Sequence, residues 1–122
     1  MDASPLCLRP RHPQVLSSEP TDTGWILYLR VPDDLVYLEG HFPQAPIVAG
    51  VCQLKWVIDY IEMHTGKPLL IKAMEAVKFH RPLLPQQRFA IELSFDSLTT
   101  SWHFQVYAAD KSFASGRLIV QP

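Results

Sequence analysis

Eleven residues near the middle of the chain carry its strongest structural signal, and they read Gly40-His41-Phe42-Pro43-Gln44-Ala45-Pro46-Ile47-Val48-Ala49-Gly50. Two prolines stiffen this segment, and its histidine has a side chain that titrates near neutral pH. An apolar run from Val51 to Met63 follows directly. A helix that starts here would present free backbone N–H groups, which stabilise negative charge. An imidazole beside such donors suits acid–base chemistry next to a carbonyl group that must be polarised.

The apolar run has the periodicity of a helix. Its apolar residues recur mainly at spacings of three and four, and they are Val51, Leu54, Val57, Ile58 and Ile61. Gly66 is a natural C-terminal cap, and Pro68 prevents the helix from continuing. We therefore expect a helix over about 49–65, apolar enough to be mostly enclosed by other elements.

Alternating apolar and polar residues predict strands on both sides of this helix. Before it, the alternation from Trp25 to Val31 fits a half-buried strand. Residues 1–24 carry four prolines, so we expect an irregular lead-in with at most a short strand over 14–17. After the helix, strands are expected over about 69–79, 89–95, 102–107 and 112–120, and their short links favour antiparallel pairing. The predicted fold is α+β, with a curved antiparallel sheet wrapped around one long helix.

Size and composition favour a single globular domain over the 122 residues. The hydrophobic share of 48% is enough for a core, and the net charge of −1 is unlike that of a nucleic-acid-binding or membrane-surface protein. Neither a membrane-spanning run nor a signal-peptide pattern is present. Cys7 and Cys52 have no metal-binding spacing. We expect a reduced, cytoplasmic protein, in which Cys52 is a small buried residue.

Two segments resemble a known enzyme family. The Gly40–Val51 segment, with its His-Phe-Pro and its helix-starting glycine, resembles the signature of the hotdog-fold 3-hydroxyacyl-carrier-protein dehydratases (FabZ/FabA-like). The 77–85 segment, Val-Lys-Phe-His-Arg-Pro-Leu-Leu-Pro, is similar to the Lys-Phe-x-x-Pro-x-x-Pro strand and turn of that family. The Gln-Leu-x-Trp pattern at 53–56 looks most like the branch associated with aryl-polyene biosynthesis, the ApeI-like dehydratases. The resemblance covers about residues 14–120 and implies a hotdog fold of five to six strands around a central helix.

The resemblance also implies roles for individual residues. It makes His41 the catalytic base, and it makes the N–H of Gly50 the donor that binds the thioester carbonyl. It places Phe42, Pro46, Val51 and Leu54 against the substrate. The family's usual glutamate or aspartate, contributed across a dimer interface, is replaced here by Lys55.

Several roles remain open for Lys55. It could be a general acid, although an ordinary ammonium with a pKa of about 10 is a reluctant donor. It could disfavour the imidazolium form of His41 and so keep the base available. It could also be a structural replacement that leaves His41 to carry the proton alone, or it could point to solvent. We favour the electrostatic and structural roles together, with Asp59 one turn further on as a candidate ion-pair partner.

The resemblance implies an acyl carrier protein and its acyl thioester as partners. The phosphopantetheine arm would come from the carrier, and no metal or other cofactor is expected. Lys78 and Arg81 are candidates for contact with an acidic carrier. Open sheet edges favour a homodimer. Because of Lys55, a heterodimer or a non-catalytic acyl-binding subunit remains an alternative, as does a hotdog thioesterase.

Overall fold

The computed structural model describes residues 12–33 and 48–121. In chain order, these ranges contain the elements β1 (Gln14–Pro20), β2 (Gly24–Arg30), α1 (Gly50–Thr65), β3 (Ile71–Phe79), β4 (Arg88–Asp96), β5 (Ser101–Ala108) and β6 (Lys111–Val120). From the sequence we also expect a short helical turn at 35–38, and this segment lies outside the described ranges.

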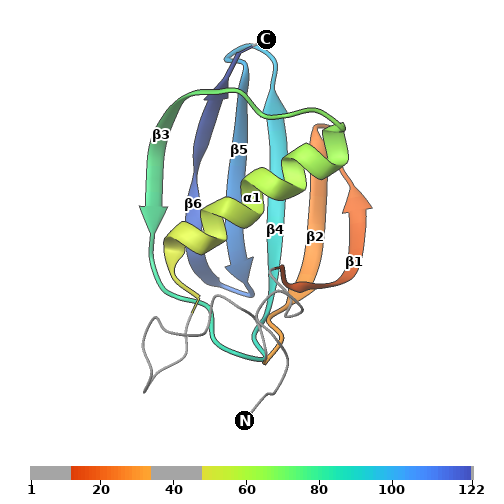
Figure 1. Cartoon of the computed structure of the whole chain (residues 1–122), viewed down its shortest axis with the longest axis vertical. Helices are drawn as coiled ribbons and strands as arrows, with labels where there is room; N and C mark the ends of the chain where they lie inside the picture. The colour runs from red at the N-terminus through yellow and green to blue at the C-terminus, as the bar shows by residue number, and fades with distance from the viewer. Residues whose placement is uncertain (1–11, 34–47, 122) are drawn as a thin grey trace.

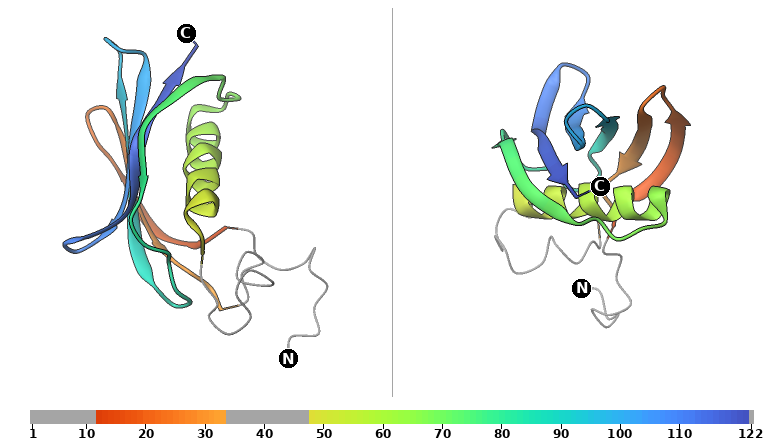
Figure 2. Two further views of the ribbon diagram at one scale, coloured as in Figure 1. Left: turned by 90° about the vertical axis from the view of Figure 1, so that its left-hand side faces the viewer. Right: turned by 90° about the horizontal axis from the view of Figure 1, so that it is seen from above.

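The strands form one six-stranded sheet in the order β1-β2-β4-β5-β6-β3, and every neighbouring pair is antiparallel. The sheet curves around α1, which lies across its concave face (Figures 1 and 2). The predicted α+β arrangement of a curved antiparallel sheet around one long helix is therefore confirmed.

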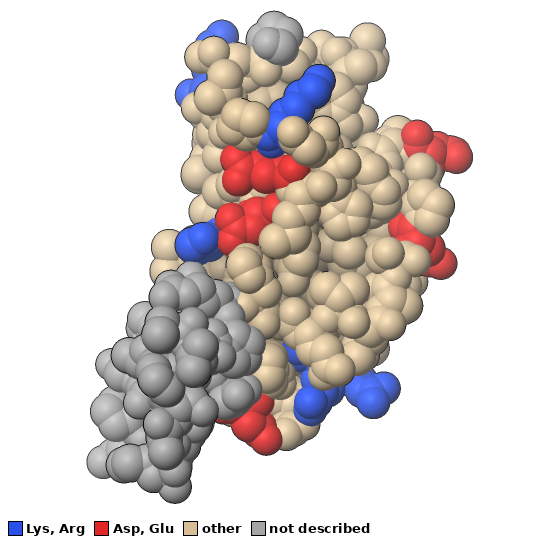
Figure 3. All heavy atoms as spheres, turned by 45° about the vertical axis from the view of Figure 1, so that its right-hand side comes forward, with Lys and Arg blue, Asp and Glu red and all other residues tan. Residues whose placement is uncertain are grey.

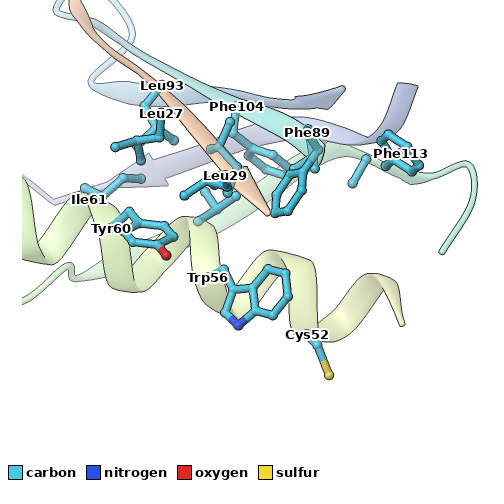
Figure 4. Packing of buried hydrophobic residues seen from close by; sticks show 14 of the residues in the cluster. Leu27, Leu29, Cys52, Trp56, Tyr60, Ile61, Phe89, Leu93, Phe104 and Phe113 are labelled. Carbon is cyan, nitrogen blue, oxygen red and sulfur yellow. The ribbon is translucent and has the colours of Figure 1, made fainter. Parts of the chain in front are cut away.

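The core lies between α1 and the sheet because the strands direct alternate side chains toward the helix. In β2, Leu27 and Leu29 are 2% and 1% exposed, whereas Tyr28 between them is 38% exposed. The register places Leu27 opposite Ile91 and Leu29 opposite Phe89. Figure 4 shows such side chains filling the space between the two layers.

The helix has the predicted bounds to within one residue. It ends at Gly66, which adopts a left-handed conformation with φ 71° and donates its N–H to the carbonyl of Glu62 at 2.9 Å. Its buried face differs from the predicted stripe, since Val51 is 67% exposed. The buried helix residues are Cys52, Gln53, Trp56, Val57, Tyr60 and Ile61. Trp56 and Tyr60 are 0% and 3% exposed, and the ring of Trp56 stacks on Phe89 of β4 with centroids 6.1 Å apart.

The irregular lead-in with at most a short strand over 14–17 is corrected by the structure, in which the chain forms the longer strand β1 over 14–20, in a hairpin with β2. Gly24 follows the turn and lies against β4, because an added Cβ would be 1.8 Å from the carbonyl oxygen of Leu93. Every residue of β1 is exposed. The strand therefore has no buried face whose apolar alternation could have predicted its full length.

β3 lies at an edge of the sheet, where it pairs with β6 and not with β4, its successor in the chain. Its pairing is interrupted between Glu75 and Lys78, where Ala76 has a positive φ of 53°. Most of β3 is exposed, including Met74 and Phe79 at 48% and 50%. The C-terminal end of β3 nevertheless reaches the start of α1, as described below.

Candidate functional site

The N-terminus of α1 has unused hydrogen-bond donors. Ala49 is the N-cap, with φ −67° and ψ 159°, and its methyl group cannot accept a hydrogen bond. The first amides bonded into the helix are those of Cys52 and Gln53, which both donate to the carbonyl of Ala49. Within the described ranges, the N–H groups of Gly50 and Val51 have no acceptor. With no acidic residue in the first turn, this end of the helix favours a negatively charged oxygen.

Phe79 packs directly on the first helical residue. A Cβ added to Gly50 would lie 2.5 Å from two ring atoms of Phe79 and 2.9 Å from its Cβ. Gly50 therefore permits a close approach between α1 and the end of β3. This contact places the exposed donors of α1 beside an edge strand.

Within the core, Gln53 links the start of α1 to the segment that follows β3. It is fully buried, and its Nε2 donates to the carbonyl oxygens of Arg81 at 3.2 Å and Val48 at 3.4 Å. Val48 also exchanges two backbone hydrogen bonds with Leu83, at 2.7 and 3.1 Å. The segment that precedes α1 is thus tied to the link between β3 and β4. Oε1 of Gln53 is buried without a hydrogen-bond partner.

Sequence reasoning assigned no role to Gln53. A signal was present, because this glutamine interrupts a run of apolar residues at a helical position that proves to be buried. Buried polar side chains in native structures are normally bonded to something specific. Here the carboxamide bonds to backbone carbonyls on two other segments.

Lys55 belongs to a charged cluster on the exposed side of α1. Its Nζ lies 3.1 Å from Oδ2 of Asp59, the ion pair expected from their spacing. The same oxygen lies 2.9 Å from Nε2 of His12. The Lys55 side chain is 56% exposed and that of Asp59 is 19% exposed.

The structure locates some of the predicted site residues. Gly50 starts the helix, Val51 is exposed next to it, Leu54 packs partly against the core, and Lys55 follows one turn later. His41, Phe42 and Pro46 lie outside the described residues. Their predicted roles therefore stay predictions from the sequence.

Cys52 lies in the first turn of α1, and its side chain is part of the core. Cys52 is 7% exposed, and burial raises the pKa of its thiol, as expected of a packing residue. The described ranges hold no group of three or more histidine, cysteine or acidic side chains arranged to bind a metal. The single helix described, α1, lacks the length and hydropathy of a membrane-spanning segment.

Charges of both signs are interspersed on the face shown in Figure 3. The acidic and basic groups there lie in small clusters, and none extends over the whole face.

Comparisons with known proteins agree with this architecture. The structure of the dehydratase heterocomplex ApeI:P from Xenorhabdus doucetiae matches with a TM-score of 0.80 and 24% identity, covering 90% of this chain and 98% of that one. An uncharacterized protein from Erwinia carotovora subsp. atroseptica matches with a TM-score of 0.72 and 27% identity, covering 90% and 96%. These likenesses support the hotdog fold.

Sequence comparison identifies the family. The 3-hydroxyacyl-[acyl-carrier-protein] dehydratase FabZ of Erythrobacter litoralis (strain HTCC2594) is 32% identical over 68 residues. That match covers 48% of this chain and 45% of the relative, so the chain spans less than half of the curated relative's length. The family model of the ApeI dehydratases matches residues 17–117, which is most of the sequence. The chain therefore belongs to the ApeI-like dehydratase family.

Proposed function

We propose that this protein removes water from a 3-hydroxyacyl thioester carried on an acyl carrier protein, giving the trans-2-enoyl thioester in fatty-acid or aryl-polyene-type biosynthesis. The observation that carries the proposal is the start of α1, where the N–H of Gly50 has no acceptor among residues 12–33 and 48–121 and can bind a thioester oxygen. Family membership supplies the reaction class, and the helix start supplies the group that this reaction needs most.

The reaction needs a base for the C2 proton, donors for charge on the thioester oxygen, and a proton for the departing C3 hydroxyl. We assign the first step to the imidazole of His41. The N–H of Gly50 and the helix dipole stabilise the oxygen that becomes negative. Phe42, Pro46, Val51 and Leu54 are proposed to contact the substrate. The phosphopantetheine arm of the carrier holds the thioester, so the protein needs no cofactor of its own in this scheme.

We propose that Lys55 acts electrostatically and not as the acid. Its ion pair with Asp59 and its exposure hold it as an ammonium, which gives up a proton reluctantly at neutral pH. A cation near the site disfavours a second one on His41, and this keeps the imidazole neutral and basic. His41 then takes the proton from C2 and returns it to the leaving hydroxyl.

The test is mass spectrometry of a 3-hydroxyacyl carrier protein incubated with the enzyme. Loss of 18 mass units from the loaded carrier supports dehydration, whereas release of the free acid would show a thioesterase. His41→Ala should lower the rate by about 10²–10⁴. No turnover by the purified protein in either direction, with no effect of His41→Ala, would leave a non-catalytic subunit as the better interpretation.

Lys55→Glu restores the family's usual acid and separates the roles of this position. We expect the variant to be slower than the parent, because the new carboxylate faces Asp59 and favours a protonated, inactive His41. A large gain in rate would show that the parent merely lacks its acid. The matched control is Lys111→Glu, which makes the same charge change at an exposed position on β6.

We further propose that two copies pair through β3, as a homodimer unless a related chain replaces one copy. The edge of β3 exposes Met74 and Phe79, and Phe79 touches Gly50 of the site. A partner at this edge lies next to the catalytic corner, unlike one at β1. Met74→Lys should shift the mass measured by light scattering toward 13.9 kDa, the mass of one chain. Val15→Lys on the exposed edge of β1 should leave the mass unchanged.

We place the carrier at the exposed residues Lys78 and Arg81, near the end of β3 and the start of the site. Basic side chains here complement an acidic carrier and raise the rate of encounter. We propose a cytoplasmic location for the protein, where carrier-bound acyl chains are made. Charge reversal at both positions should raise KM for the carrier with little change in kcat.

A further inference from the structure

A cavity of about 570 Å³ lies at the C-terminal end of α1, away from the proposed catalytic corner. The link from α1 to β3 passes over the ends of β4, β5 and β6 at this end of the molecule (Figures 1 and 2). The cavity is lined by Leu69 and Leu70 of this link and by Phe95, Trp102 and Val120 of the strands. Its volume falls in the range of pockets that bind small molecules.

The walls of this cavity are held by backbone hydrogen bonds. The N–H of Gln121 donates to the carbonyl of Leu70 at 3.0 Å, which ties the link to the end of β6. The N–H of Val120 donates to the carbonyl of Thr100 at 3.0 Å, which ties β6 to the turn before β5. Main-chain hydrogen bonds therefore fix the walls of the cavity where the α1–β3 link, the end of β6 and the turn before β5 meet.

Its lining combines an aromatic surface with a single charge. The rings of Phe95 and Trp102 lie 5.2 Å apart at an angle of 58°, and Trp102 is only 7% exposed. Lys67 is the one charged lining residue, and its ammonium has no ion pair or hydrogen bond among the described residues. Leu70 is 59% exposed beside it, which leaves apolar surface open to solvent.

We propose that this cavity is a second ligand site, which binds a small aryl carboxylate with its ring against Trp102 and Phe95 and its carboxylate at Lys67. The side chains of Phe95 and Trp102 can make edge-to-face and stacked contacts with the aryl ring of the ligand. The unpartnered ammonium complements a single negative charge, and the mostly apolar lining disfavours ligands with several charges.

This site is distinct from the proposed catalytic corner. α1 has 16 residues, so its two ends are about 24 Å apart at 1.5 Å per residue. A ligand bound at Lys67 therefore does not contact the N–H of Gly50. The proposal goes beyond the proposed dehydration and does not depend on it, because binding can be measured without a thioester.

The test is a titration of the ¹⁵N-labelled full chain with 3-phenylpropionate, followed by two-dimensional NMR. We expect saturable shifts of the indole N–H of Trp102 and of the amides of Leu69 and Leu70, with a Kd on the order of 1 mM for so small a ligand. The indole of Trp56, under the middle of the helix, should not shift. The neutral analogue 3-phenylpropanol should bind about threefold to fivefold more weakly, since it lacks the charge.

Three variants complete the experiment. Leu70→Glu puts a carboxylate at the exposed rim and should abolish the shifts, and Lys67→Gln should weaken binding about threefold to fivefold. Lys111→Gln removes a lysine from β6, at the opposite end of the sheet, and should change nothing. The proposal is overturned if no saturable shift occurs, if the alcohol binds as tightly as the acid, or if the shifts centre on Gly50. Tighter binding of octanoate than of 3-phenylpropionate would overturn the aryl assignment.

Discussion

Gly50→Ala tests the closest contact in the proposed site. The added Cβ would lie 2.5 Å from Cγ and Cδ1 of Phe79 and 2.9 Å from its Cβ. These atoms form the base of the side chain, so rotation of the ring cannot remove the overlap. The start of α1 must move away from β3 instead.

The expected cost follows from two opposing effects. Overpacking of this kind destabilises a protein by about 1–3 kcal/mol. Alanine is favoured over glycine in a helix by up to about 1 kcal/mol, and this gain is smallest at a helix end. We therefore expect Gly50→Ala to lower the free energy of unfolding by about 1–2 kcal/mol, measured by urea titration.

The effect on activity should exceed the effect on folding. The N–H of residue 50 is kept in the variant but displaced, and misplacement by about 1 Å can cost about 10²-fold in rate. We expect kcat for the carrier-bound substrate to fall by about tenfold to a hundredfold under conditions where the variant is fully folded. Met63→Ala, at an exposed position on the same helix, is the control and should leave kcat unchanged.

A double-mutant cycle identifies the cause. Phe79→Gly removes all three clashing atoms, so the pair Gly50→Ala and Phe79→Gly should cost less than the sum of the single variants by about 1–3 kcal/mol. Strict additivity, or a Gly50→Ala variant as stable and as active as the parent, would refute the packing argument.

Three further substitutions test other contacts of the helix. Gln53→Glu should destabilise the protein more than Gln53→Leu in urea unfolding at pH 7, because a carboxylate cannot donate to the carbonyls of Val48 and Arg81 and would bury a charge; equal effects would contradict this role. Asp59→Asn should lower the free energy of unfolding by about 1 kcal/mol or less, since its ion-pair partner Lys55 is 56% exposed. Tyr60→Phe should raise stability by about 1 kcal/mol, because the hydroxyl is buried without a partner. Burial also raises the pKa of Tyr60, so the folded state keeps a proton that the unfolded chain loses above about pH 10, and the loss of stability at alkaline pH should be less steep in Tyr60→Phe.

Elements with one buried face could be predicted from the sequence. In β2 and β4 the alternating apolar residues point to the helix, and both strands were predicted almost at their observed bounds. β1 carries no such pattern because all of its side chains are exposed. β1 is held by main-chain pairing with β2. The order of apolar and polar residues does not predict such pairing.

For the helix, the sequence predicts the bounds better than it predicts the buried face. The C-terminal end of the helix follows from local residues such as Gly66 and Pro68. The face that the helix buries depends instead on its packing against the side chains of the sheet. Apolar residues cover so much of its surface that several faces could have been the buried one. The buried face is the one that carries Trp56, whose ring stacks on Phe89 of β4, and this contact is a tertiary property. The pairing of β3 with β6 also joins strands that are distant in the sequence, so the short links between successive strands do not predict it.

The start of α1 shows how the site was partly predictable. A helix that served only to support the fold would gain about 1 kcal/mol from Ser, Asp or Asn at position 49, yet this chain has alanine there and no acid in the first turn. The unused donors are instead held in position from outside the helix, by Phe79 against Gly50, by the carboxamide of Gln53, and by the pairing of Val48 with Leu83. Those contacts join two segments, 48–53 and 79–83, that are far apart in the sequence, so no local sequence pattern predicts them. A helix start that is fixed by its neighbours and has no cap among the described residues keeps its donors in place, and the proposed dehydration of thioesters would use such donors for the oxygen that becomes negative.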